Sequence, residues 1–147
     1  VCSSREEAVD AALDLIDKNS LAYEAVEVGK KFVNQSASNL HDHYGDMSPV
    51  HSMNNLAVVI WAFLSFQDSF DEAIGETICC GWDTDCTGAT VGGLIGLDKG
   101  SIPESWTDPW QGRVNTAIAG VGELKLEDLV ERTCKLVDQF SSESDMD

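Results

Sequence analysis

One long apolar stretch limits the possible folds of this chain more than any other feature. From about Val50 to Phe66 the residues are almost all apolar, and only the beginning, from His51 to Asn55, is polar. The Ala, Leu, Ile and Trp content over about four turns favours a helix over a strand, and a helix that is apolar on every side is buried. We therefore expect a buried helix whose polar start faces a cleft.

Other helices are predicted on both sides of this stretch. A serine followed three residues later by a glutamate, the capping-box pattern, occurs at Ser4 and at Ser69. Residues 41–49 combine Gly, Pro and Asp without periodicity, which predicts a loop. Capping patterns and periodic apolar residues predict helices over about 4–18, from Ser20, over 69–79, near Val114 and over 126–140. No segment alternates like a strand, so the predicted fold class is all-α, a compact multi-helix domain.

A run of small residues follows position 87. Gly88, Gly92 and Gly96 recur at four-residue spacing, with apolar residues between them. In a helix this spacing removes side chains from one stripe and lets a neighbouring helix approach closely, at a cost of about 1 kcal/mol per glycine. We expect a central helix in this part of the chain.

The charge balance excludes some partners. Nine Lys plus Arg against 26 Asp plus Glu give a formal net charge of -17, which disfavours nucleic acid and anionic membrane surfaces because like charges repel. The five cysteines form no disulfide ladder and no zinc motif, which predicts reduced thiols and a cytoplasmic protein. The longest apolar run is about half of the roughly 20 residues that a membrane span needs.

The segment from Cys80 to Gly88 carries the candidate chemistry. Asp83 and Asp85 are separated by one residue at the start of a predicted helix. Carboxylate oxygens with a nearby hydroxyl are hard ligands, which suit magnesium, manganese or calcium better than zinc. An equally open alternative is that Asp83 caps the helix and that Asp85 only complements the helix dipole.

Three other readings of metal or phosphate motifs fit less well. An EF-hand loop would place Leu94 at its last ligand position, where a bidentate glutamate is required. The nucleophile loop of haloacid-dehalogenase-type phosphatases has to follow a buried strand, and the residues after this segment look helical. His41 and His43 could form a metal pair, but they lie in a predicted loop without a third ligand, which favours solvated side chains.

The ordered pieces around the two aspartates resemble a known family. The segment Gly81 to Gly96, followed by Ile102-Pro103 and Trp106, resembles the C-terminal signature of the ADP-ribosylglycohydrolases, including the dinitrogenase-reductase-activating glycohydrolases. The resemblance extends upstream to residues 50–55 and the apolar helix, and it covers about residues 48–140. It implies an all-helical fold.

The resemblance also implies how the chain is organised. Residues 1–140 are expected to form the C-terminal portion of an ADP-ribosylglycohydrolase-like domain. Residues 141–147 are acidic and polar, which predicts a disordered tail.

A site with two adjacent Mg2+ or Mn2+ ions follows from the resemblance. Asp83 and Asp85 match the two metal-binding aspartates of the family signature. The family commonly places a threonine directly after the second aspartate as a further ligand. Here that position is Cys86, a softer ligand for a hard cation, and Thr87 is the alternative hydroxyl ligand.

The resemblance places the polar start of the apolar helix at the substrate cleft. His51, Asn54 and Asn55 are then candidates for substrate binding, together with Gly81 and Trp82 in the turn before the aspartates. Capping of the helix by His51 and Asn54 is an equal alternative. Trp82 is equally a core residue or a ring that stacks on an adenine or ribose. No catalytic residue is identified.

The implied activity is metal-dependent hydrolysis of the glycosidic bond between ADP-ribose and its acceptor, in a small molecule or an ADP-ribosylated protein. The family's other half-site, a Thr-Asp-Asp cluster, has no counterpart in these residues. We therefore expect this chain to supply half of the site, while a partner chain, a further segment or a homo-oligomer supplies the rest. The alternative is a non-catalytic helical module for binding or support.

Overall fold

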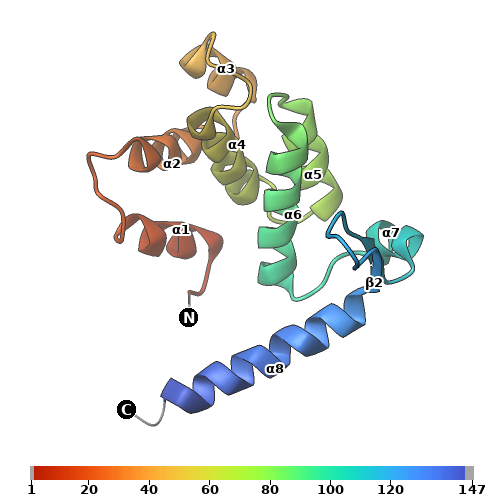
Figure 1. Ribbon diagram of the computed structural model, residues 1–147. Coiled ribbons are helices and arrows are strands. Elements are labelled where there is room, and N and C mark those ends of the chain that lie inside the picture. Colours follow the sequence, from red (N-terminus) through yellow and green to blue (C-terminus); the bar gives the residue numbers. More distant parts are fainter. Residues whose placement is uncertain (1, 145–147) are drawn as a thin grey trace. The chain divides into compact units, whose positions relative to one another are not determined.

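Helices dominate the computed structural model, which describes residues 2–144. The chain divides into two compact units after Ile102. Six helices form the described part of the first unit (Figure 1). They are α1 (Arg5–Leu13), α2 (Leu21–Lys31), α3 (Ser38–Tyr44), α4 (Ser52–Ser65), α5 (Phe70–Cys79) and α6 (Thr84–Lys99).

Serine side chains cap three of these helices, and the sequence predicts two of these caps, Ser4 and Ser69. The side-chain oxygens of Ser4, Ser20 and Ser69 accept hydrogen bonds from backbone N–H groups at the starts of α1, α2 and α5. Helix α1 ends at Leu13 instead of near residue 18. Just beyond it, the Asp17 carboxylate accepts from the backbone N–H of Asn19 at 2.9 Å, and such local bonds favour a turn over a continued helix.

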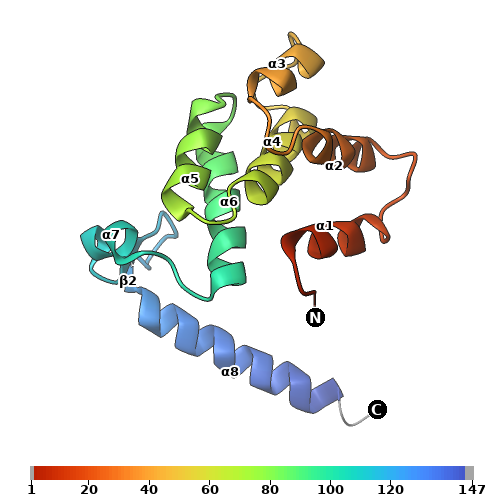
Figure 2. The ribbon, with the colours of Figure 1, turned by 180° about the vertical axis from the view of Figure 1, so that it is seen from behind.

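Helix α4 is the buried helix that the apolar stretch predicts. It lies between α2 on one side and the α5–α6 pair on the other, as both views of the molecule show (Figures 1 and 2). All of its residues from Ala57 to Leu64 are buried. Trp61 is fully enclosed, and its ring N–H donates to the carbonyl of Gln35 at 3.1 Å. The core of the first unit is therefore built around α4.

The glycine stripe of α6 faces apolar side chains of the same unit. A methyl group built at Gly88 would come within 2.9 Å of Ile78, and one at Gly92 within 3.5 Å of Ile74, both in α5. A methyl group at Gly96 would lie 3.2 Å from Ile102. The four-residue spacing thus lets α5 approach α6, which confirms the predicted close packing.

The predicted loop over 41–49 is wrong in its first part, because α3 extends through His41 to Tyr44. Leu40 and Tyr44 are one helical turn apart and both are buried, so packing against the core outweighs the low helix propensity of the segment. The helix ends at Gly45, whose φ of 54° is in the left-handed region that glycine tolerates.

The second unit begins at Pro103. Its elements are α7 (Glu104–Thr107), the 3-10 helix η1 (Asp108–Trp110), β1 (Arg113–Asn115), β2 (Glu123–Lys125) and α8 (Leu126–Ser144). The prediction of a helix near Val114 is wrong, since Val114 pairs with Leu124 in an antiparallel hairpin. Gly112, Gly120 and Gly122 all have positive φ, which supports turns at the hairpin ends.

The last helix is longer than the sequence predicts. Helix α8 includes residues 141–144, which the sequence analysis assigns to a disordered tail, and residues 145–147 of that tail lie outside the described part of the chain. The all-α class is confirmed, with one short two-stranded sheet as an addition. Among the described helices, none combines the length and the apolar character that crossing a membrane requires.

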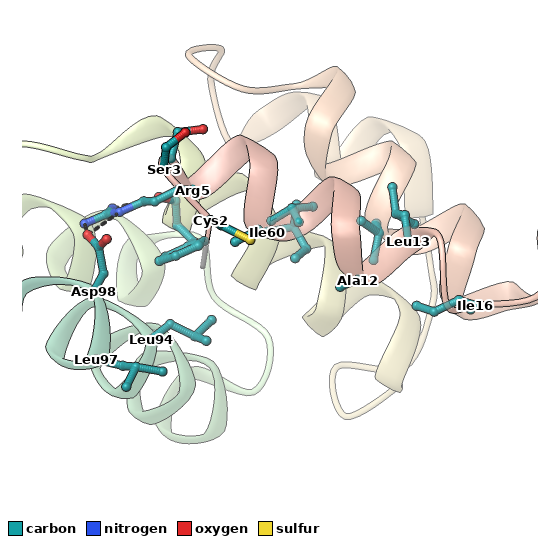
Figure 3. Close-up of a pocket in the computed structure, with 15 residues that line it drawn as sticks. Cys2, Ser3, Arg5, Ala12, Leu13, Ile16, Ile60, Leu94, Leu97 and Asp98 are labelled. Atoms are coloured by element: carbon teal, nitrogen blue, oxygen red, sulfur yellow. Dashed lines mark hydrogen bonds and ion pairs between the residues drawn. The ribbon is translucent and has the colours of Figure 1, made fainter.

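An apolar cavity of about 370 Å³ lies within the first unit, lined by residues of α1, α2, α4 and α6 (Figure 3). Arg5 is 4% exposed, and Figure 3 shows it paired with Asp98 at the edge of the cavity. The Arg5 Nε and Nη2 atoms both lie 2.9 Å from the Asp98 Oδ2 atom, and Nη1 donates to the Phe63 carbonyl at 2.8 Å. This ion pair ties α1 to α6.

The ion pair leads to a prediction on stability. We expect Asp98→Asn to lower the free energy of unfolding by about 1–2 kcal/mol, because it leaves the buried Arg5 guanidinium without its counter-charge while Asp98 itself is partly exposed. Urea unfolding measures this change. Asp10→Asn, which removes the exposed partner of Lys30, is the control and should cost less than about 0.5 kcal/mol. Equal effects of the two substitutions would contradict the prediction.

Candidate functional site

The turn between α5 and α6 carries the two aspartates. Helix α5 ends at Cys79, and Gly81 and Trp82 follow with φ angles of 82° and 60°. Two consecutive residues in the left-handed region reverse the chain and place Asp83 at the N-cap position of α6. The left-handed region suits Gly81, but it is strained for a bulky residue such as Trp82. A strained residue persists only where its surroundings hold it.

Asn55 connects this turn to the start of α4. Its Oδ1 atom accepts a hydrogen bond from the backbone N–H of Asp83 at 3.2 Å. Its Nδ2 atom donates to the carbonyls of Pro49 and His51, each at 2.8 Å. The polar start of the apolar helix thus lies beside the carboxylate turn, as the sequence analysis expects, although Asn55 contacts the backbone of the turn and not its carboxylates.

Three potential ligands meet at the start of α6. One ligand atom each from Asp83, Asp85 and Cys86 can be chosen so that all lie within 4.8 Å of one another. Asp83 is half-buried, while Asp85 and Cys86 are exposed. The Asp83 side chain makes no capping hydrogen bond although it occupies the N-cap position. The alternative in which Asp83 serves as a helix cap is therefore not supported.

The electrostatics of this cluster are those of two acids close together. A hydrogen bond with Asp83 lowers the pKa of the Asp85 carboxyl, and the backbone N–H groups of Asp85 and Cys86 lower this pKa further. The hydrogen bond with Asp83 raises the pKa of the Cys86 thiol, and the negative charges of Asp83 and Asp85 add to this effect. Two carboxylates with a protonated thiol fit a hard divalent cation better than a soft one.

Thr87 is directed into its own helix. The side chain is buried, and its hydroxyl donates to the carbonyl of Asp83 at 3.0 Å and lies 3.4 Å from that of Thr84. These bonds hold the first turn of α6 together. The Thr87 hydroxyl is thus hydrogen-bonded to the backbone of its own helix, whereas Cys86 is one of the three residues of the ligand cluster.

His51 and Asn54 have different surroundings. His51 is exposed and caps α4, since its Nδ1 atom accepts a hydrogen bond from the backbone N–H of Met53 at 3.2 Å. Asn54 is fully buried and its Nδ2 atom donates to the carbonyl of Ser48 at 3.2 Å. Its Oδ1 atom has no hydrogen-bond partner within the described chain. The capping alternative therefore holds for His51 but not for Asn54.

The sequence analysis missed the role of His41: the side chain is exposed, as expected of a solvated residue, but it belongs to α3 and contacts the turn. The His41 ring lies against the Trp82 ring, with a centroid distance of 4.1 Å and an interplanar angle of 33°. Its Nε2 atom is 2.6 Å from the carbonyl oxygen of Cys80. Recognising Leu40 and Tyr44 as a helical pair would have placed His41 on a helix, but its contact with Trp82 has no local signal.

The buried thiol beside this contact leads to a prediction on pH. Burial raises the pKa of Cys80 from its ordinary value of 9.0 to about 11, and the charge of Glu76 adds to the effect. Between these values the folded chain binds more protons than the unfolded chain, so the free energy of unfolding falls as the pH rises. In Cys80→Ala, we expect the free energy of unfolding to fall by up to about 2 kcal/mol less over this pH range than in the wild type.

Urea unfolding at pH values from about 8 to 11 measures the effect of Cys80. Cys79→Ala is the matched control, because Cys79 is the exposed neighbour of the buried thiol. It should leave the pH dependence as it is in the wild-type chain. A wild-type slope in Cys80→Ala would contradict the prediction, because it would show that the pKa of this thiol is the same in the folded and the unfolded chain.

One of three comparisons with known proteins identifies a family. The sequence matches the family described as ADP-ribosylglycohydrolase over residues 2–144. The matched region includes the carboxylate turn, the start of α4 and the second unit. Comparison with curated proteins and with solved structures gave no match.

Proposed function

Because the chain belongs to the ADP-ribosylglycohydrolase family, we propose that the turn bearing Asp83 and Asp85 is part of a metal-dependent site that hydrolyses ADP-ribosyl glycosidic bonds. The observation that carries the proposal is the meeting of these two carboxylates with Cys86 within 4.8 Å. The substrates would be ADP-ribose-containing small molecules or ADP-ribosylated proteins, or a related nucleoside-diphosphate compound.

Asp83 and Asp85 would hold Mg2+ or Mn2+, and a complete site would contain two such ions. A bound divalent cation neutralises substrate oxygens and makes water a better nucleophile at neutral pH. Cys86 would be a weak additional ligand, because its thiol prefers softer metals. Thr87, the other ligand candidate, supports the site by holding the Asp83 carbonyl within the first turn of α6.

The residues around the turn would bind and orient the substrate. Asn55 fixes the backbone of Asp83, while Gly81 and Trp82 form the edge of the turn nearest to α3. His51 is exposed at the start of α4 and Asn54 has a free acceptor in the interior. Cleavage of a glycosidic bond passes through an oxocarbenium-like transition state.

The proposed site contains only half of the ligands that the family resemblance implies. We expect this chain alone to be inactive, with the remaining carboxylates supplied by a partner chain, another copy or a further segment of the protein. All five cysteines are unpaired, which supports a reducing, cytoplasmic setting.

Calorimetric titration tests this proposal. ADP-ribose is titrated into the chain with Mn2+, with Mg2+ and with neither ion, and Mn2+ binding is followed separately by electron paramagnetic resonance. We expect Mn2+ to bind and ADP-ribose to bind only with a divalent ion. Failure of Mn2+ to bind would overturn the half-site and favour a non-catalytic helical module for binding or support.

A further inference from the structure

Building on the proposed function, we propose that His41 is a positioning residue for the carboxylate turn. It holds Cys80 and Trp82, and thereby sets the place of Asp83 relative to Asp85. His41 belongs to α3, which is separate from the two helices that bear the turn. Its contact with the turn therefore joins an element of the core to the proposed metal site.

Helix α3 is a firm support for this contact. Leu40 and Tyr44 anchor it in the core on either side of His41 along the helix. The Tyr44 ring also contacts Trp82, with its centroid 6.1 Å away and the two rings nearly perpendicular at 80°. Trp82 is therefore met by two rings of α3, one stacked against it and one edge-on.

His41 contacts the residues on both sides of Gly81 in the turn. Gly81 has a positive φ, and a Cβ built there would meet no atom within 4 Å other than those of its chain neighbours. The His41 Nε2 atom is hydrogen-bonded to the carbonyl of Cys80, which precedes Gly81. The His41 ring contacts Trp82, which follows Gly81. Together these contacts hold the backbone across Gly81.

The strained backbone of Trp82 explains why the turn needs these contacts with His41. A φ of 60° costs a bulky residue about 1–3 kcal/mol and persists only where neighbouring groups enforce it. Without the His41 ring, Trp82 can return to a relaxed conformation. Asp83 is covalently next to Trp82 whereas Asp85 lies inside α6, so this relaxation would separate the two carboxylates.

Three substitutions at His41 separate the effect of its hydrogen bond to Cys80 from that of its ring contact with Trp82. His41→Ala removes both, His41→Gln keeps an N–H donor for the Cys80 carbonyl, and His41→Phe keeps a ring against Trp82. The control is His43→Ala, two residues along the same helix, because the His43 ring contacts Phe32 and Tyr44 and not the turn. Should His41→Ala fail to fold, the Gln and Phe variants carry the comparison.

The measurements are Mn2+ affinity by electron paramagnetic resonance and the 19F resonance of Trp82 in chain labelled with 5-fluorotryptophan, assigned with Trp82→Phe. We expect His41→Ala to weaken Mn2+ binding about 10-fold, as loss of a residue behind metal ligands commonly does. The Trp82 resonance should shift even without metal. His41→Gln and His41→Phe should each retain part of the wild-type Mn2+ affinity and show a smaller shift of the Trp82 resonance. His43→Ala should have the wild-type affinity and resonance.

Two results would overturn the inference. One is a wild-type Trp82 resonance and wild-type Mn2+ affinity in His41→Ala. The other is an equal loss of affinity in His43→Ala, which would indicate a general loss of stability and not positioning. If the wild-type chain binds no Mn2+, the proposed function fails, and a wild-type metal-free Trp82 resonance in His41→Ala would still overturn the inference.

Discussion

Replacing Asp83 and Asp85 together by asparagine should abolish Mn2+ binding by this chain. Asparagine keeps the size of each side chain but removes the negative charge that a hard cation requires. The loss of Mn2+ affinity should exceed the roughly 10–100-fold loss that is typical when a residue supporting a metal ligand is replaced, because here both carboxylate ligands of the cluster are removed. Electron paramagnetic resonance of free Mn2+ measures this affinity directly.

The matched control for this double variant is Asp42→Asn with Asp46→Asn. It makes the same change in net charge at two exposed aspartates outside the ligand cluster. Wild-type affinity in the control with complete loss in the Asp83 and Asp85 variant would assign binding to the turn. A similar loss in both variants would show that Mn2+ binds only through the overall charge of -17.

Metal binding should also appear as stabilisation. A ligand that binds only the folded chain raises the free energy of unfolding by about 2.7 kcal/mol at a concentration 100 times its dissociation constant. The double variant should gain nothing from added Mn2+. Urea unfolding of the double variant and of the wild type without metal separates loss of binding from loss of folding.

Among Gly→Ala substitutions in the first unit, Gly29→Ala should lower the free energy of unfolding most, by about 3 kcal/mol or more. Gly29 lies where α2 packs on the central helix α4. An added Cβ would come within 2.7 Å of the Ala57 carbonyl oxygen and within 2.8 Å of the Ile60 Cβ atom. Neither atom is at the end of a flexible side chain, so the two helices themselves would have to separate.

Gly75→Ala is the control for this substitution. Gly75 lies in the interior of α5, and a methyl group there would meet no atom within 4 Å. Alanine has the better helix propensity, so this variant should gain about 0.5–1 kcal/mol. Urea unfolding of both variants measures the difference. A loss below about 1 kcal/mol in Gly29→Ala would show that α2 and α4 can adjust to the extra methyl group.

Features that depend on residues close together in the chain could be predicted from the sequence. Ser4, Ser20 and Ser69 mark helix starts because capping joins groups two or three positions apart. The apolar residues of α4 determine burial through their composition alone. The carboxylate cluster was predictable for the same reason, since Asp83, Asp85 and Cys86 are within one helical turn of each other.

Features in which residues far apart in the chain meet could not be predicted in this way. The segment 38–44 is helical because Leu40 and Tyr44 are buried in the core, and its Asn-, His- and Asp-containing sequence carries no local sign of that packing. The contact of His41 with Trp82 joins residues of two separate elements. Propensity and periodicity describe neighbours along the chain, whereas burial and ring contacts depend on which elements pack together.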